Sequence, residues 1–452
     1  MSVNAQTGRH PWNVLALLVA AQFMVVLDIT IVNVALPSIG GALAFSAGGL
    51  PWVVTAYVLS AGGLYLVGGR LADLVGRRTT FLMGLATFTG ASLACGLAGS
   101  PGLLIAARAV QGAGAALLTP SALSILAVTY GGAQRAQALA IWGAVGSAGA
   151  GAGVVAGGML TTWLSWEWVF WVNVPVGAAV AVATLRVIEA GLPRAAGRPA
   201  WRALDLPGTA TSVAGLVTLV YGISEKRLPV AAAGLALLVA FLTIERRVAR
   251  PLVAPSAWRI PALAPGALAM LATTGLLAGT FFLGSVQLQR QLGFSALETG
   301  LAFLPLVVAI GAGVHVTSHA IGRVGSRALM GAGLALVAAG AVVGSGGSYA
   351  SAILPGMVLL GLGFGLTLPS VSIASMSAVG HDRAGAASGL MSTAHEVGAA
   401  LGVAVLSSVA GASFAFGDAM LAMAVAAGAL AAAALVAAPV VRPAEGARVA
   451  AH

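Results

Sequence analysis

The chain is poor in charged residues, in cysteine and in lysine, and each shortage excludes a class of protein. Only 8% of its 452 residues are charged, whereas a soluble domain carries about a quarter. With 59% hydrophobic residues, this composition predicts a polytopic membrane protein. The single cysteine, Cys95, excludes an internal disulfide. No cleavable signal peptide is expected, because the first apolar run is too long and lacks a small-residue cleavage site.

The scarcity of lysine bears on the energy source. Lys226 is the only lysine, and it lies in no G-x-x-x-x-G-K-[ST] phosphate-binding loop. This sequence therefore does not encode an ATP-driven pump, and transport would draw on an ion gradient or on the substrate itself. A channel is disfavoured as well, because no filter sequence or ring of charged residues recurs along the chain.

Ionisable residues are almost absent from the apolar segments. We expect only Asp28, Arg108 and Glu396 within the membrane, which is too sparse a set for a membrane enzyme. His395 and Glu396 begin like the zinc motif H-E-x-x-H, but the fifth residue is Ala399, so no metal site is predicted. No cofactor is expected either.

Apolar segments separated by short polar or turn-rich breaks predict fourteen membrane-spanning helices. They cover residues 13–36, 50–69, 79–98, 102–127, 137–160, 168–188, 206–222, 229–244, 263–288, 298–318, 327–344, 351–374, 387–411 and 418–438.

The basic residues alternate between the two sides of the predicted membrane. Of the 22 basic residues, 18 fall in loops on one side, three fall on the other side, and Arg108 lies within a span. The positive-inside rule therefore predicts that both termini are cytoplasmic. Because these residues are spread over many short loops, the net charge of +10 does not indicate a nucleic-acid partner.

The sequence also contains a weak internal repeat with a constant offset of 249 residues. The recurring pairs are Gly76/Gly325, Arg78/Arg327, Gly84/Gly333, Gly112/Gly361, Gly114/Gly363, Leu117/Leu366, Pro120/Pro369, Ser121/Ser370, Gly149/Gly398 and Gly153/Gly402. The offset equals eight spans, so the first six and the last six spans are predicted to be parallel copies of one unit. Parallel six-helix halves are typical of transporters that rock around a central site near the membrane midplane.

The repeat predicts how the chain is divided. The predicted units are an N-terminal six-helix half at 1–190, cytoplasmic linkers with the two inserted spans at 191–260, a C-terminal six-helix half at 261–440, and a cytoplasmic tail at 441–452.

Four segments resemble the motifs of one transporter family. Residues Leu27–Pro37 resemble L-D-x-T-I-V-N-V-A-L-P, and Gly69–Arg78 resemble G-x-L-a-D-r-x-G-r-r, with Leu74 at the usually basic position. Arg108–Gly114 resemble R-x-x-q-G-x-g, and Trp168–Gly177 resemble W-x-F-x-x-N-x-P-x-G. The chain is thus similar to the major facilitator superfamily, and within it to the fourteen-helix drug:proton antiporters of the EmrB/QacA type. The resemblance implies an all-α polytopic membrane protein with two parallel six-helix halves and two inserted linker helices.

The fifth span resembles the antiporter motif g-x-x-x-G-P-x-x-G-G of the same family. Gly149, Gly153, Gly157 and Gly158 match it, whereas Val154 occupies the position of the proline. Small residues at these spacings let helix backbones approach closely and bend. We therefore expect the glycines, rather than a proline kink, to supply flexibility in this helix.

Asp28 and Arg108 are predicted to pair, directly or through water. Counted along their helices, they lie ~12 Å and ~9 Å from the outer surface, at similar depth in the same half. A buried arginine without a partner is very costly, and Asp28 is the only acidic residue in the spans of that half. A conformational change that separates the pair would change the protonation of Asp28 and couple protons to transport. The alternative is a static structural ion pair.

Glu396 is the second candidate for proton coupling. It lies ~15 Å from the cytoplasmic end of its span, near the midplane. Its only basic neighbour is His395, which we expect to point elsewhere on the helix. Because burial disfavours charge, this carboxyl is expected to be protonated part of the time, as suits a proton carrier or a site for cationic substrates. The alternative is a neutral, hydrogen-bonded side chain with no role in transport.

Several further residues are candidates for contact with substrate. The rings of Trp52 and Tyr57 could receive flat or cationic compounds, although anchoring at the membrane interface is the alternative for Trp52. Asn33 and Gln111 lie in the two motif segments nearest the predicted ion pair and are further candidates.

The loop after the second span is predicted to be a cytoplasmic gate. Asp73, Arg77 and Arg78 can form charge pairs with neighbouring helix ends when the cytoplasmic side closes, and Gly69 and Gly76 allow tight turns. The alternative is that the arginines only set the topology, which leaves Asp73 unexplained.

Together these features predict a monomeric, proton-coupled transporter of the cell membrane. It would export small amphipathic or cationic compounds, including drugs or antibiotics, by alternating access, with the substrate, protons and lipid as its partners. An exporter dedicated to one endogenous metabolite is the main alternative. A non-transporting membrane sensor built on the same fold is a minor one.

Overall fold

The computed structural model describes residues 11–188, 205–248, 260, 262–377, 379, 384–411 and 416–437, and the regular structure within these ranges is helical throughout. In chain order the helices are α1 (Pro11–Ala42), α2 (Trp52–Val75), α3 (Arg77–Gly96), α4 (Pro101–Thr129), α5 (Gly132–Trp163), α6 (Trp168–Trp171), α7 (Asn173–Val187), α8 (Leu206–Ser224), α9 (Leu228–Glu245), α10 (Leu263–Val286), η3 (Gln287–Gln291), α11 (Ala296–Val324), α12 (Ser326–Val343), η4 (Tyr349–Ile353), α13 (Leu354–Met376), α14 (Ala384–Ala410) and α15 (Phe416–Ala437).

Within the described ranges, 13 helical stretches are long and apolar enough to cross a membrane. Three of them combine two elements each, namely α6 with α7, α10 with η3, and η4 with α13. The remaining predicted span, residues 206–222, is present as the 19-residue helix α8. The prediction of an all-α, multi-pass membrane protein is therefore confirmed.

The internal repeat appears in the structure as equivalent turns. Gly76, which joins α2 to α3, has φ +102°, and Gly325, which joins α11 to α12, has φ +84°. A residue with a side chain is strained at such φ values, so glycine permits the near-immediate reversal of the chain at both places.

The repeat also appears as equivalent packing between helices. Gly84 of α3 lies directly against Gly114 and Leu117 of α4, where any side chain would clash. The same arrangement recurs between α12 and α13, 249 residues later, with Gly333, Gly363 and Leu366. Close backbone approach through small residues is a general way of packing helices in membranes.

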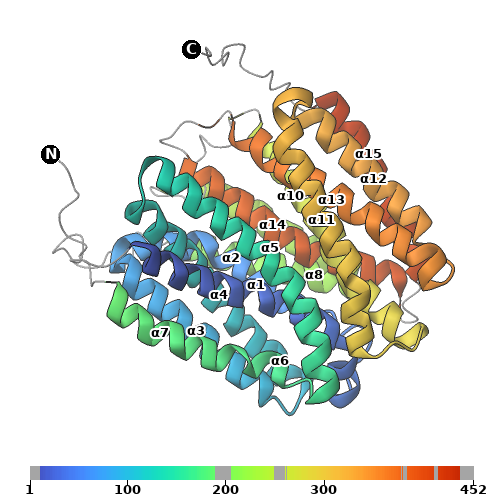
Figure 1. The fold of residues 1–452 in the computed structure, drawn as a ribbon, viewed down its shortest axis with the longest axis horizontal. Coiled ribbons are helices and arrows are strands. Elements are labelled where there is room, and N and C mark those ends of the chain that lie inside the picture. Colours follow the sequence, from blue (N-terminus) through green and yellow to red (C-terminus); the bar gives the residue numbers. More distant parts are fainter. Residues whose placement is uncertain are drawn as a thin grey trace.

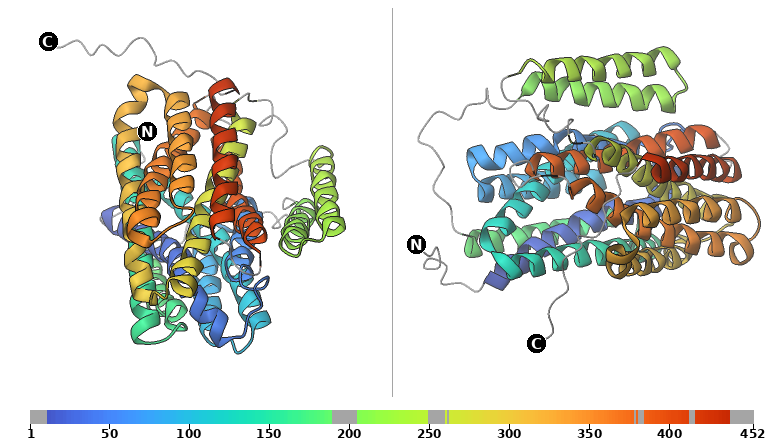
Figure 2. Two further views of the ribbon diagram at one scale, coloured as in Figure 1. Left: turned by 90° about the vertical axis from the view of Figure 1, so that its right-hand side faces the viewer. Right: turned by 90° about the horizontal axis from the view of Figure 1, so that it is seen from above.

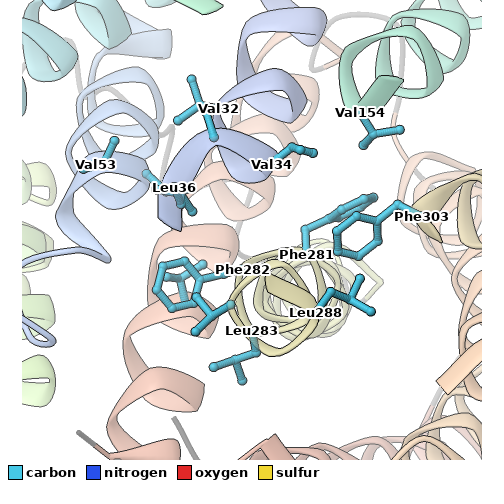
Figure 3. Close-up of a cluster of buried hydrophobic side chains, with 14 of the residues drawn as sticks. Val32, Val34, Leu36, Val53, Val154, Phe281, Phe282, Leu283, Leu288 and Phe303 are labelled. Carbon is cyan, nitrogen blue, oxygen red and sulfur yellow. The ribbon is translucent and has the colours of Figure 1, made fainter. Parts of the chain in front are cut away.

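The two sets of helices form two bundles that meet along a shared core. Figure 1 shows the N-terminal helices, in blue to green, beside the C-terminal helices, in yellow to red, with α5 and α11 crossing between them. Buried apolar side chains from both sets join here, as Figure 3 shows. The labelled members are Val32, Val34, Leu36, Val53, Val154, Phe281, Phe282, Leu283, Leu288 and Phe303.

The inserted helices α8 and α9 form a hairpin on the flank of the molecule. Figure 2 shows the two helices, in light green, side by side and outside the main bundle. Helix α8 contacts α2 of the first half and α14 of the second, whereas α9 packs on α8. The hairpin therefore covers the line along which α2 and α14 meet.

The boundaries predicted between the units cannot be compared with the helices. The chain at 189–204, at 261 and at 438–452, which contains these boundaries, lies outside the described residues.

Candidate functional site

Asp28 lies at the centre of a fully buried polar network in the N-terminal half. Its Oδ2 forms an ion pair with Arg108 Nη1 at 2.6 Å, so the predicted pairing is present. Its Oδ1 accepts hydrogen bonds from Gln111 Nε2 and from Asn173 Nδ2, each at 2.8 Å. The exposed fractions of Asp28 and Arg108 are 0% and 1%. Because buried charges are costly unless paired and hydrogen-bonded, this set of donors is what allows the carboxylate to remain in the core.

Arg108 is held equally firmly. Its Nη1 also donates to Gln111 Oε1 at 2.6 Å, and its Nε donates to the carbonyl oxygen of Val53 at 2.9 Å. The guanidinium carbon lies 4.3 Å from the centre of the Tyr57 ring and 5.7 Å from that of Phe170. These cation–π contacts and hydrogen bonds explain why the family motif combines an arginine with a glutamine three residues later.

The network uses two of the residues predicted to contact substrate. Gln111 is fully buried and donates to Ser92 Oγ at 2.8 Å as well as to Asp28. Tyr57 is buried and presents its ring to Arg108. In this conformation, both side chains serve the ion pair, so contact with a substrate would require the network to open.

The two remaining candidates for substrate contact lie elsewhere. Asn33 Nδ2 donates to the carbonyl oxygen of Ile29 at 2.8 Å, and its buried Oδ1 has no hydrogen-bond partner. Trp52 packs against Tyr221 of α8, with ring centres 6.3 Å apart. Trp52 therefore links the first half to the inserted hairpin.

A cavity of about 320 Å³ lies between the two halves and contains Glu396. Tyr65 of α2 donates from its hydroxyl to Glu396 Oε1 at 3.5 Å, a long hydrogen bond that crosses from one half to the other. Gly62 of α2 lies against the Cβ of Glu396 and so lets α2 and α14 approach closely. The cavity is lined by Tyr65, Thr119, Met270, Ser372, Met376, Ser388, Met391, Ser392, His395 and Glu396.

The cavity corrects one expectation and adds residues that the sequence did not indicate. His395 lines the same cavity as Glu396, so the expectation that it points elsewhere is wrong. Consecutive helix residues differ by about 100° in direction, and the cavity is wide enough to receive both. Tyr65 and Thr119 were missed because a lone polar residue in an apolar run carries no periodic signal.

The lining gives the cavity a mixed chemistry. Its described residues combine one carboxyl, one imidazole and several hydroxyl groups with three flexible methionines, and no lysine or arginine is among them. Methionine side chains adapt to ligands of irregular shape. The arrangement therefore suits a compound with an apolar body and a few hydrogen-bonding or basic groups.

The predicted gate loop is held by hydrogen bonds to other helices of the N-terminal half. Arg77 Nε donates to Ser124 Oγ of α4 at 2.6 Å, and Arg78 Nη2 donates to the carbonyl oxygen of Leu185 in α7 at 3.1 Å. Asp73 is exposed and forms no ion pair with any described residue, and Gly69 lies next to Pro120. The charge pairs that would close a gate are absent from this conformation of the described chain.

The glycines of α5 pack against both halves. Gly149, Gly153 and Gly157 lie against the backbone of α1, the helix that carries Asp28. Gly158 lies against α11 of the other half, and α5 runs through Val154 without interruption. The helix backbones thus approach closely here without the motif proline, and the expected flexibility of α5 stays a prediction.

The sequence profile of the Major Facilitator Superfamily matches residues 18–403, which include the Asp28 network and the cavity. The chain belongs to this superfamily. Two solved structures share the fold of this chain, each with a TM-score of 0.71. One is a bacterial homologue of the human lysosomal transporter Spinster in an inward-facing and occupied conformation, which is 16% identical and covers 95% of this chain and 97% of its own. The other is the peptide transporter POT in complex with sulfate, at 15% identity and 93% coverage of both chains.

Three relatives of higher identity are named for the compound that they export or resist. The cephamycin export protein CmcT of Amycolatopsis lactamdurans is 39% identical over 437 residues, which cover 91% of this chain and 89% of that protein. The puromycin resistance protein pur8 of Streptomyces alboniger is 38% identical, with 90% and 83% covered. The tetracenomycin C resistance and export protein of Streptomyces glaucescens is 32% identical, with 88% and 75% covered.

Proposed function

We propose that this superfamily member is a proton-coupled secondary transporter that exports small amphipathic or cationic compounds, and that it belongs to the fourteen-helix drug:proton antiporters. The observation that carries the proposal is the cavity between the halves, where Glu396 is the one acidic residue among the described residues of the lining. A carboxyl at this place can bind either a proton or the basic group of a substrate, which is the exchange that antiport requires. The names of the antibiotic exporters and resistance proteins among its relatives support the same direction of transport.

The packing supports alternating access. At the ends of the helices predicted to face outside, the halves are joined by Gln289 Nε2, which donates to the carbonyl oxygen of Val34 at 2.8 Å. Leu297 N also donates to Thr162 Oγ1 there, at 3.1 Å. The cavity lies on the other side of these contacts, so the conformation corresponds to one closed toward the outside. Rocking of one half against the other would break the outer contacts and close the cavity from the inside.

The two carboxyl groups receive different roles in this proposal. Glu396 lies in the cavity and takes the proton or the substrate cation first. Asp28 is sealed by three donors and participates only if the conformational change opens its network. We also propose that the protein is a monomer of the cell membrane with cytoplasmic termini, divided into the units 1–190, 191–260, 261–440 and 441–452.

The proposal is tested with purified protein in proteoliposomes under an imposed pH gradient, with a panel of cationic dyes and antibiotics as substrates. We expect accumulation that follows the gradient and disappears when the gradient is collapsed. Glu396→Gln should abolish the dependence on pH, whereas Glu298→Gln should retain it, because Glu298 is exposed and glutamine also satisfies a capping box. Transport that ignores the gradient would refute proton antiport.

A dedicated exporter of one metabolite is the second candidate. It is favoured by relatives that are named for the export of single compounds, cephamycin and tetracenomycin C. Under the same conditions, such an exporter would move one natural product and none of the dyes. Asp28→Asn, compared with Glu396→Gln in both assays, would show which carboxyl carries the coupling proton.

A further inference from the structure

Two histidines on α11 form a close pair that the proposed transport cycle does not use. His315 and His319 are one helical turn apart, both are exposed, and their ring centres are 4.3 Å apart. They lie ~14 Å and ~8 Å from the cytoplasmic end of a membrane-spanning helix, where ionisable residues are rare and usually functional. The sequence prediction of ionisable residues in the membrane named only Asp28, Arg108 and Glu396, and so missed this pair.

Hydrogen bonds orient the pair. His319 Nδ1 lies 2.9 Å from the carbonyl oxygen of His315 and 3.0 Å from Ser318 Oγ. Because a carbonyl oxygen can only accept, the bond to it keeps the proton on Nδ1 and leaves the lone pair on Nε2. An imidazole whose other nitrogen donates to a backbone carbonyl is the usual arrangement of a metal-binding histidine.

We propose that His315 and His319 form a binding site for a divalent transition-metal ion such as Cu²⁺, Ni²⁺ or Zn²⁺. Imidazole nitrogens suit these metals, and two histidines four residues apart on a helix can reach one ion. Within the described ranges, no group of three or more histidine, cysteine or acidic residues lies close enough together to hold such an ion. Water or a donor from a dissolved compound therefore completes the coordination, and the site is weaker than a closed four-ligand site.

The position of the pair links this site to the transport cycle. Toward the outside, α11 packs tightly on α5, with Gly300 against Val154. Farther inward this close contact is absent at the glycines, since neither Gly146 of α5 nor Gly311 of α11 has another atom within 4 Å of an added Cβ.

We call the stretch where α5 and α11 face each other at Gly146, Gly311 and farther inward the inner seam. The internal repeat indicates which residues would meet when this seam closes. Leu66 of α2, which precedes His315 by 249 residues, packs directly against Gly389 of α14. Gly389 corresponds in turn to Ala140 of α5, which is exposed. Closure of the inner seam would thus bring Ala140 against His315 and displace a metal ion with its water. A bound metal accordingly favours the state in which the inner seam is open.

The binding is tested by titrating Cu²⁺ or Ni²⁺ into full-length protein that carries no histidine tag, with calorimetry as the readout. One ion per chain should be lost in His315→Ala and in His319→Ala. The same ion should be retained in Val316→Ala, an exposed control on the same helix, and in His395→Gln, which leaves the pair intact. Unchanged stoichiometry and affinity in the double variant His315→Ala/His319→Ala would refute the site.

The effect on the cycle needs a separate readout. Spin labels at Leu139→Cys of α5 and Val324→Cys of α11, in a Cys95→Ala background, report the width of the inner seam; Leu139 and Val324 are both exposed. Metal should raise the ratio of the long-distance (open) population to the short-distance (closed) population at least several-fold. It should leave this ratio unchanged when His315 and His319 are replaced. Binding without any shift would refute the link to the cycle while leaving the site intact, and neither result depends on proton coupling.

Discussion

At the scale of single residues, the Asp28 network shows how a membrane protein tolerates a buried ion pair. Asp28 accepts hydrogen bonds from Arg108, Gln111 and Asn173, and Arg108 also donates to a backbone carbonyl and lies over the ring of Tyr57. The second half lacks the arginine of this ion pair, since the residue 249 positions after Arg108 is Met357. The pair is therefore not required by the six-helix unit as such, which makes a coupled rather than a purely structural role worth testing.

Removing one partner of the pair should destabilise the protein more than removing both. Arg108→Met leaves the Asp28 carboxylate buried without its counter-charge, at a cost of about 3–5 kcal/mol. Adding Asp28→Leu should restore a large part of this loss, because both members are then apolar, as in the second half. The measurement is thermal unfolding of the two variants in detergent. Equal or additive losses in the double variant would contradict this account.

The hydrogen bond between Tyr65 and Glu396 should make a small contribution. At 3.5 Å it lies at the long limit of a hydrogen bond, so its net contribution is at most about 1 kcal/mol. Tyr65→Phe should therefore raise the apparent KM for substrate less than about tenfold and leave the fold intact. Tyr221→Phe on the outer hairpin is the matched control and should have no effect. A complete loss of transport in Tyr65→Phe would assign Tyr65 a direct part in proton transfer.

At the scale of elements, α5 is the helix on which both halves depend. One of its glycine faces packs on α1, and another faces α11. Toward its inner end, a Cβ added at Gly146 would meet no atom within 4 Å. The same helix therefore has glycines packed against a neighbouring backbone and glycines with free space beside them. This contrast allows the packing role of glycine to be separated from its flexibility.

Substitutions along α5 should differ sharply with position. Gly153→Leu would clash with Thr30 and with the carbonyl oxygen of Leu27, so it should destabilise the protein by about 1–3 kcal/mol or prevent its folding. Gly146→Ala meets no atom and should stabilise the helix by about 0.5–1 kcal/mol. Thermal unfolding and expression in membranes give the comparison. Similar tolerance at both positions would contradict the packing described for α5.

Helices α8 and α9 also acquire a definite place at this scale. The ring contact of Trp52 with Tyr221 and the packing of Val213 of α8 on Gly63 of α2 hold the hairpin against the first half. Helix α8 contacts α14 of the second half as well. The hairpin thus covers the α2–α14 seam, whereas no inserted helix packs on the α5–α11 seam in the described part of the chain.

At the scale of the whole molecule, two hydrogen bonds join the halves at the predicted outer end, from Gln289 to Val34 and from Leu297 to Thr162. A cross-link there should stop the cycle. Thr162→Cys with Leu297→Cys, in a Cys95→Ala background, should form a disulfide under mild oxidation, because Leu297 N lies 3.1 Å from Thr162 Oγ1. Transport should fall at least tenfold and recover on reduction. The inner pair Gly146→Cys with Gly311→Cys serves as the control and should cross-link only when substrate or a pH gradient populates the opposite state.

Much of the fold was accessible from the sequence, and less of the site. The fourteen apolar segments all form helices, and the offset of 249 residues recurs in the turns at Gly76 and Gly325. The pairing of Asp28 with Arg108 followed from equal depth along two helices. The hydrogen bond from Asn173 to Asp28, by contrast, was not predicted, because the sequence does not show which helix lies beside α1.

The sequence by itself determined the membrane class, the number and repeat of the helices, and the presence of an ion pair. These properties follow from the length of apolar runs, from regular spacing and from the cost of burying charge, all of which are written along one chain. Only the tertiary structure decided that Asp28 is sealed while Glu396 and His395 share a cavity, and that the seam beside His315 is open. Those features depend on which helix faces meet, and the free energies that select one packing over another are sums over many contacts between distant residues.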